Sequence, residues 1–350
     1  MTILLVEDEK DSIDSCIEYA KGDRRKVNIE VAKNFDEVYA CLEKDIDAAI
    51  VDIRLETDTT AGNKVIEEIN KLSLRLPTVV HTGTPSSVQA DVLKVFTKGE
   101  HTYKDIFDYL FSVSNTGIMN ILGRKGILEK KLQFVYMKNV LPIMNDSWIK
   151  YGEIDPLKTE RGLLRYILNH LQQSFDTNDD SEKFFPEEMY IYPPLTEDYL
   201  TGSIVNKKNN NNKYIILSPA CDLALHGPER AFKTERILLA EIKDISEIIK
   251  QIDKKNPDED ERNKRKACLF RNNHALYYHW LPKTAFFDGG LINFRRLSSF
   301  KKKELVDIFS KPIIQISPLF CKDIVSRFSS YYARQGQPDI DIDLYIKTSE

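Results

Sequence analysis

Residues 48–52 read Ala48-Ala49-Ile50-Val51-Asp52. Four apolar residues followed by an acid describe a short buried strand that ends on a carboxylate. Such a near-continuous apolar run is typical of a parallel sheet that helices cover on both faces. In open α/β sheets, ligands bind outside the carboxyl ends of the strands. We therefore expect Asp52 to lie at a ligand-binding edge.

The surrounding sequence alternates between strand-like and helix-like segments. The further apolar runs are Ile3–Val6, Val27–Val31, Pro77–Val80 and Leu93–Thr97. The segments with apolar residues at helical spacing are Asp11–Ala20, Asn34–Lys44 and Ala61–Leu72. This alternation predicts an α/β domain with a doubly wound, parallel five-stranded sheet over residues 1–112. Only residues 83–92 separate the last two strands, which predicts a stunted helix or an irregular loop there.

Polar residues follow several of these strands. Glu7 and Asp8 end the first strand, and Thr82 and Lys98 end the fourth and fifth. These side chains and Asp52 would meet in one crevice at the carboxyl edge of the sheet. Carboxylates grouped in this way favour Mg²⁺, which prefers oxygen ligands and retained water. A hydroxyl and an ammonium can hold phosphoryl oxygens beside a nucleophilic aspartate.

Residues 1–112 resemble the receiver domain of bacterial two-component response regulators. The matching segments are Leu4-Leu5-Val6-Glu7-Asp8-Glu9, Ala49-Ile50-Val51-Asp52-Ile53-Arg54-Leu55, Val79-Val80-His81-Thr82-Gly83 and Val95-Phe96-Thr97-Lys98. The resemblance implies that Asp52 is the phosphoacceptor, Thr82 the switch hydroxyl and Lys98 the phosphate-binding lysine. It also implies that Glu7, Asp8 and Asp52 hold Mg²⁺. A histidine kinase or another phosphodonor protein would then be the partner in phosphorelay signal transduction.

Three departures from the family pattern affect the output side. Val95 stands where an aromatic switch residue is usual, Gly99 replaces a proline, and the helix after Thr82 is missing or short. We therefore expect a signal to leave through the helices after residue 112. The alternative is a pseudo-receiver that keeps the fold and serves only as a docking surface.

The rest of the chain predicts two further regions. Residues 113–182 have helical spacing without strands and form a predicted helical connector. Residues 183–350 mix strands and helices and form a predicted α+β output domain. Within it, residues 202–205 and 214–217 predict a hairpin, and the charge-dense residues 254–266 predict an exposed loop.

The output domain offers a weaker chemical hypothesis. Asp222, Glu241 and Lys243 have the acid, acid and lysine order of a metal-dependent nuclease effector. Common acids in a charged chain explain the same order, so we do not predict a catalytic site here. A third hypothesis is a pseudo-receiver subunit in the assembly of a bacterial defence system, with a protein partner for the C-terminal domain.

Composition and hydrophobic patterning indicate the class of protein and its cellular location. No run approaches the ~18 apolar residues that a membrane-spanning helix needs, and no signal pattern opens the chain, which predicts a cytoplasmic protein without a membrane partner. The five cysteines are scattered, and we expect most of them to be buried packing residues. Residues 1–112 are acidic, with 22 Asp and Glu against 14 Lys and Arg. Basic and aromatic residues interleave near the C-terminus, a weak indication of nucleic-acid binding.

Overall fold

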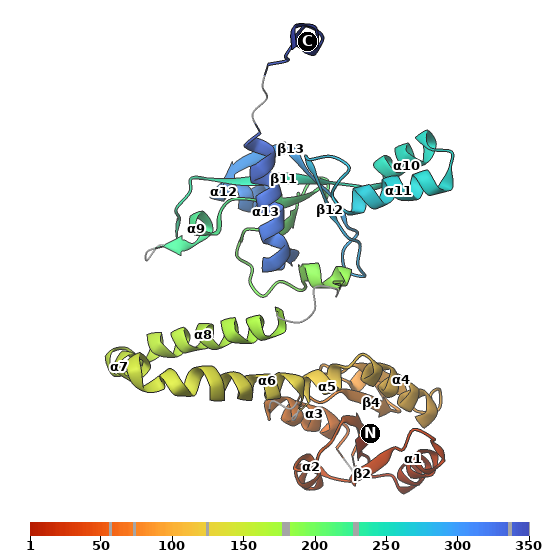
Figure 1. Ribbon diagram of the computed structural model, residues 1–350. Coiled ribbons are helices and arrows are strands. Elements are labelled where there is room, and N and C mark those ends of the chain that lie inside the picture. The colour runs from red at the N-terminus through yellow and green to blue at the C-terminus, as the bar shows by residue number, and fades with distance from the viewer. Residues whose placement is uncertain are drawn as a thin grey trace. The chain divides into compact units, whose positions relative to one another are not determined.

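The computed structural model divides the chain into two compact units, Met1–Asp180 and Ser181–Glu350 (Figure 1). It describes residues 1–55, 58–72, 75–123, 126–176, 183–226, 231–334 and 338–349. The boundary predicted at residue 182 lies in residues 177–182, outside the described part of the chain.

The first unit contains a parallel sheet of five strands among the described residues, in the order β2-β1-β3-β4-β5. The strands are β1 (Thr2–Val6), β2 (Asn28–Ala32), β3 (Ala48–Val51), β4 (Thr78–Thr82) and β5 (Lys94–Thr97). This order is that of flavodoxin-like doubly wound domains. The predicted α/β fold is confirmed.

Helices cover both faces of this sheet. On one face α1 (Lys10–Gly22) and α4 (Tyr103–Asn115) bury apolar residues against Ile3, Leu5 and Ile50. On the other face α2 (Phe35–Leu42) and α3 (Ala61–Lys71) pack against alternate residues of the same strands. Because successive side chains of a strand point to opposite faces, each short strand serves both cores.

A 3₁₀ turn, η1 (Pro85–Ser87), is the helical element between β4 and β5. Asn63 of α3 compensates for the missing helix. Its Nδ2 atom donates to the carbonyl of Ser87 over 2.9 Å, and its Oδ1 atom accepts from the amide of Gln89 over 2.9 Å. These bonds satisfy backbone groups that an α-helix would have paired internally.

The remaining described part of the first unit is helical, as predicted for the connector. It comprises α5 (Ile118–Leu122), α6 (Ile127–Val135), the π-helical η2 (Tyr136–Val140), the 3₁₀ turn η3 (Leu141–Ile143), the π-helical η4 (Met144–Trp148), α7 (Ile149–Ile154) and α8 (Pro156–Asp176). Helix α8 turns back and packs along α6 and α7 (Figure 1). Arg75, which precedes β4, connects α5 and α6 to the sheet domain: it donates hydrogen bonds to the carbonyl of Leu122 and to the carboxylate of Glu129.

The second unit is an α+β domain built on a curled antiparallel sheet. Its described order is β12-β13-β11-β8-β7-β14-β6. The strands are β6 (Tyr190–Ile191), β7 (Ser203–Asn206), β8 (Lys213–Ile216), β11 (Arg236–Lys243), β12 (Tyr278–Leu281), β13 (Gly290–Lys301) and β14 (Ile314–Ile316). A small separate pair joins β9 (Leu225–His226) to β10 (Ala231–Phe232). The predicted hairpin is the antiparallel pair β7–β8.

The second unit also contains helices. They are the 3₁₀ turn η5 (Pro186–Met189), α9 (Ala220–Leu223), α10 (Ser246–Lys255), α11 (Glu259–Phe270), α12 (Lys302–Ile308), α13 (Pro318–Tyr332) and α14 (Ile342–Ser349). The loop predicted for residues 254–266 is wrong, because most of it belongs to α11. Asp258 caps that helix by accepting a hydrogen bond from the amide of Glu261, and acids fill the first turn. Both features stabilise the start of a helix. The dense charges of this segment therefore indicate the N-terminus of a helix and not a loop.

Candidate functional site

Glu7, Asp52 and Lys98, which were predicted to share one crevice, lie at the carboxyl ends of β1, β3 and β5. The Nζ atom of Lys98 lies 2.7 Å from Glu7 Oε2 and 2.6 Å from Asp52 Oδ2. Glu7 and Asp52 are only 2% and 7% exposed. The structure thus brings three of the sequence-predicted residues into direct contact. Asp8, the fourth, follows Glu7 directly in the loop before α1.

Backbone contacts fix the position of Asp52. Its amide donates to the carbonyl of Val6 over 2.9 Å, which ties the end of β3 to the end of β1. Gly62, the second residue of α3, packs directly on Asp52: a Cβ atom at that position would lie 2.1 Å from the Asp52 carbonyl oxygen. Only glycine allows this close approach, so α3 and the strand end that carries Asp52 form one rigid corner.

Thr82 ends β4 beside the crevice and is buried. Its carbonyl accepts a hydrogen bond from the amide of Lys98 over 2.9 Å. Its hydroxyl oxygen lies 3.4 Å from that of Thr84 and accepts from the Thr84 amide over 3.3 Å. Thr82 is therefore a neighbour of Lys98 through the backbone, with its hydroxyl turned to the loop after β4.

Burial and charge act together in the crevice. Burial raises the pKa of the Glu7 carboxyl above its ordinary value of 4.5, while hydrogen bonding and attraction from Lys98 oppose that rise. Burial alone would lower the pKa of Lys98. Hydrogen bonds to Asp52 and Glu7 outweigh that effect and hold the pKa above 10.5. The lysine is thus charged at neutral pH and neutralises part of the negative charge around it.

Two residues that the sequence did not single out reach the same crevice. Ser12 Oγ of α1 donates to Glu7 Oε2 over 2.9 Å, and it lies 2.8 Å from the hydroxyl of Tyr103 at the start of α4. A hydroxyl five residues after the first acid was a possible signal for Ser12. No sequence signal indicated Tyr103, because its position depends on how α4 packs back against the sheet.

The donor set of the crevice suits a divalent cation. Oxygens of Glu7 and Asp52 converge on one cationic atom, the Nζ of Lys98. No cluster of three or more His, Cys, Asp or Glu residues within the described ranges is arranged to hold a metal ion. Magnesium does not require such a cage, since it binds through one or two carboxylates together with water and phosphate oxygens. The residues present fit that mode.

The nuclease hypothesis finds no assembled site in the second unit. Glu241 and Lys243 share a face of β11, and Glu241 accepts a hydrogen bond from Arg296. The carbonyl of Asp222 instead accepts from the amides of residues 233 and 234, before β11 begins. Glu241 is the sixth residue of β11, so roughly 15 Å of strand lies between the start of β11 and Glu241. The structure therefore does not gather the three residues.

The basic and aromatic residues near the C-terminus largely satisfy one another. The guanidinium of Arg295 lies 3.8 Å from the ring centroid of Tyr277 and donates to the hydroxyl of Tyr331. Arg334 lies 4.3 Å from the ring centroid of Tyr331. Each of these cation–π contacts covers one face of a tyrosine ring on which a nucleic-acid base could otherwise stack.

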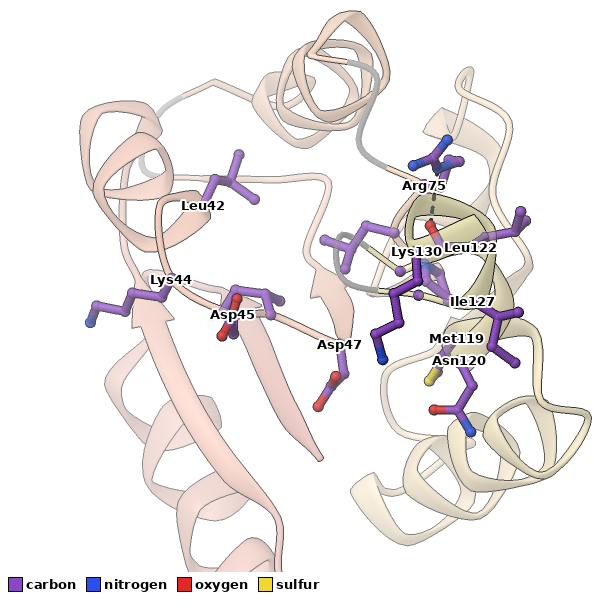
Figure 2. Close-up of a pocket in the computed structure, with 15 residues that line it drawn as sticks. Leu42, Lys44, Asp45, Asp47, Arg75, Met119, Asn120, Leu122, Ile127 and Lys130 are labelled. Carbon is purple, nitrogen blue, oxygen red and sulfur yellow. Dashed lines mark hydrogen bonds between the residues drawn. The ribbon is translucent and has the colours of Figure 1, made fainter. Parts of the chain in front are cut away.

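A cavity of about 500 Å³ lies at the opposite, amino-terminal edge of the parallel sheet. The loops before β3 and β4 form one wall, and α5 and α6 form the other. Figure 2 shows Lys130 and Met119 facing Asp45 and Asp47 across it. The strands separate this cavity from the crevice of Asp52, so the two are distinct features of the first unit.

None of the described helices is long and apolar enough to cross a membrane.

No protein-family model and no curated protein matches the sequence. Among solved structures, a CheY-like receiver domain protein from Methanospirillum hungatei JF-1 is 18% identical, with a TM-score of 0.28, over 36% of this chain and 98% of that one. A response regulator from Thermotoga maritima in complex with Mg²⁺ and BeF is 22% identical, with a TM-score of 0.27, over 31% and 97%.

The phosphorylated cyanobacterial phytochrome response regulator RcpA is 21% identical, with a TM-score of 0.26, over 36% of this chain and 95% of that one. These identities and TM-scores are too low to assign the chain to a family. By its own parallel strand order, β2-β1-β3-β4-β5, the N-terminal part of this chain has the flavodoxin-like, doubly wound fold.

Proposed function

We propose that this protein is a response-regulator-like signalling protein whose Asp52 accepts a phosphoryl group in a Mg²⁺-dependent crevice. The observation that carries the proposal is the contact of Lys98 Nζ with both Asp52 and Glu7 at the carboxyl ends of three parallel strands. The donor would be a histidine kinase or another phosphodonor protein.

The chemistry requires a nucleophile, charge neutralisation and a hydroxyl. A carboxylate oxygen of Asp52 forms the new bond to phosphorus. The bond between phosphorus and the donor breaks, and the donor leaves with that bonding electron pair. Lys98 lies within hydrogen-bond distance of Asp52 and offsets the added negative charge. Thr82, at the end of the adjacent strand, supplies a hydroxyl for a phosphoryl oxygen.

Glu7, Asp8 and Asp52 would hold the magnesium ion. When bound, the ion neutralises phosphoryl oxygens and fixes their orientation. Glu7 and Asp52, whose oxygens pair with the single positive charge of Lys98 in the structure, would then bind the ion instead. Lys98 would then be available to bind the phosphoryl group.

The phosphoryl charge on Asp52 would shift the balance between arrangements of the receiver and alter the state of the C-terminal output domain. Val95 is half-buried against the apolar core that α2 and α3 cover, and no aromatic switch occupies its position. The helical connector, residues 113–182, is the covalent route between the two units.

The test is phosphorylation of the full chain by a small phosphodonor, such as acetyl phosphate, in the presence of Mg²⁺. Intact mass should show the gain of one phosphoryl group in the wild-type protein. Asp52→Asn should abolish the gain, and Asp14→Asn, which changes an exposed acid of α1, should not. No gain in the wild-type protein, or an equal gain in Asp52→Asn, would exclude Asp52 as the phosphoacceptor and leave the docking role of a pseudo-receiver.

A further inference from the structure

A chain of hydrogen bonds leaves the crevice and ends at the start of α4. Ser12 Oγ donates to Glu7 Oε2 over 2.9 Å, and the hydroxyl of Tyr103 lies 2.8 Å from the same Ser12 oxygen. A serine hydroxyl has one hydrogen. Since Ser12 gives that hydrogen to Glu7, Tyr103 must donate to Ser12, and the chain runs from Tyr103 through Ser12 to Glu7.

Tyr103 is held in place from several sides. It is the first residue of α4 and is buried. Its ring packs edge-on against His81, with 5.0 Å between ring centroids, and His81 precedes Thr82 in β4. Thr102 and Asp105 form a capping box that fixes the helix start. A displacement of the Tyr103 hydroxyl therefore requires a movement of the first turn of α4.

Glu7 Oε2 is the atom on which this chain and the phosphate-binding lysine meet. It accepts from Lys98 over 2.7 Å and from Ser12 over 2.9 Å. Both ends of the segment from Lys98 to Tyr103 are thus attached to one carboxylate oxygen. A cation that takes this oxygen competes with Lys98 directly and acts on α4 through Ser12.

We propose that Ser12 and Tyr103 are positioning residues for the Glu7 carboxylate, and that their hydrogen-bond chain links divalent-cation binding in the crevice to the first turn of α4. This inference rests on the proposed function and deepens it by naming the route from the crevice. The route uses Tyr103 after β5 in place of an aromatic residue at position 95. Helix α4 leads directly into α5, so the linkage reaches the start of the helical connector.

The experiment compares full-length wild type with Ser12→Ala, Ser12→Thr, Tyr103→Phe and the double variant Ser12→Ala/Tyr103→Phe. Tyr109→Phe is the matched control, because the Tyr109 hydroxyl belongs to the same helix and points to the carbonyl of Leu93. Mg²⁺ affinity is measured by calorimetric titration. Hydrogen–deuterium exchange of residues 103–115 is recorded with and without Mg²⁺.

Ser12→Ala and Tyr103→Phe should each weaken Mg²⁺ binding about tenfold, as is usual when a residue that orients a metal ligand is lost. Ser12→Thr should restore affinity because it keeps the hydroxyl. The double variant should be no weaker than the weaker single variant, because both substitutions break one chain. Mg²⁺ should change exchange at the start of α4 in wild type and Tyr109→Phe, but not in Tyr103→Phe.

The outcomes separate the inference from the proposed function. A wild-type protein that binds no Mg²⁺ overturns the proposed function and, with it, the link to the cation. A wild-type protein that binds Mg²⁺, with Tyr103→Phe equal to Tyr109→Phe in affinity and exchange, overturns the inference alone. Fully additive losses in the double variant also overturn it, since independent sites do not form a chain.

Discussion

The ammonium nitrogen of Lys98 lies 2.6 Å from Oδ2 of Asp52, at the carboxyl edge of the parallel sheet. The same nitrogen holds Glu7, which is even more deeply buried. A half-buried lysine between two buried carboxylates is costly to remove, because the acids that remain lose their neutralising charge. This relationship makes the candidate site a determinant of stability as well as of chemistry.

Lys98→Met should therefore lower the free energy of unfolding by about 3–5 kcal/mol, the usual cost of removing one partner from a buried ion pair. Urea unfolding of the full chain measures it. Lys104→Met is the control, since Lys104 pairs with Asp108 on an exposed face of α4 and should cost about 0–1 kcal/mol. Equal losses in the two variants would contradict a structural role for Lys98. Mg²⁺ should recover part of the loss only in Lys98→Met.

Gly62→Ala should displace α3 from the strand end that carries Asp52. A Cβ atom would meet the Asp52 carbonyl at 2.1 Å and Ile53 Cα at 2.6 Å, and backbone atoms cannot move aside cheaply. We expect a loss of about 3 kcal/mol or more in urea unfolding, together with slower phosphorylation of Asp52. Gly22→Ala, where a Cβ atom meets open space, should be neutral or slightly stabilising. A neutral Gly62→Ala would show that the corner is not rigid.

Asn63→Ala should loosen the segment that stands in for a helix between β4 and β5. The substitution removes both hydrogen bonds to residues 87 and 89 and takes that partner from two part-buried backbone groups. The expected loss is about 1–3 kcal/mol, with faster hydrogen–deuterium exchange over residues 83–92. The exposed Asn70→Ala on the same helix serves as the control. Unchanged exchange in Asn63→Ala would mean that the segment is held by other contacts.

The five cysteines should differ sharply in reactivity toward a thiol reagent at pH 8. Cys221 and Cys268 are exposed and should react at once. Cys16 should not, because burial and the nearby Glu7 raise its pKa to about 12, so the reactive thiolate is scarce at that pH. Burial also raises the pKa of Cys41. Unfolding in urea should release both thiols; rapid labelling of Cys16 in the folded protein would contradict its burial.

The sequence predicted the doubly wound parallel fold because short strands with two buried faces leave a near-continuous apolar signature. Asp52 directly follows such a strand, and Lys98 directly follows β5, so their meeting at one edge follows from parallel topology. The expectation that most cysteines are buried was wrong, since two are buried and two are exposed. A scattered cysteine carries no periodic pattern, so its exposure depends on neighbours distant in the sequence.

The sequence by itself determined the parallel sheet, the order of its elements and the polar residues at its carboxyl edge, because each is encoded within a few consecutive residues. Tertiary structure alone decided that Lys98 bridges Glu7 and Asp52, that Ser12 and Tyr103 join them, and that Asp222 stands apart from Glu241. Those contacts join residues as many as 91 positions apart. The packing angles of helices and the curl of the second sheet set such distances, and no local pattern records them.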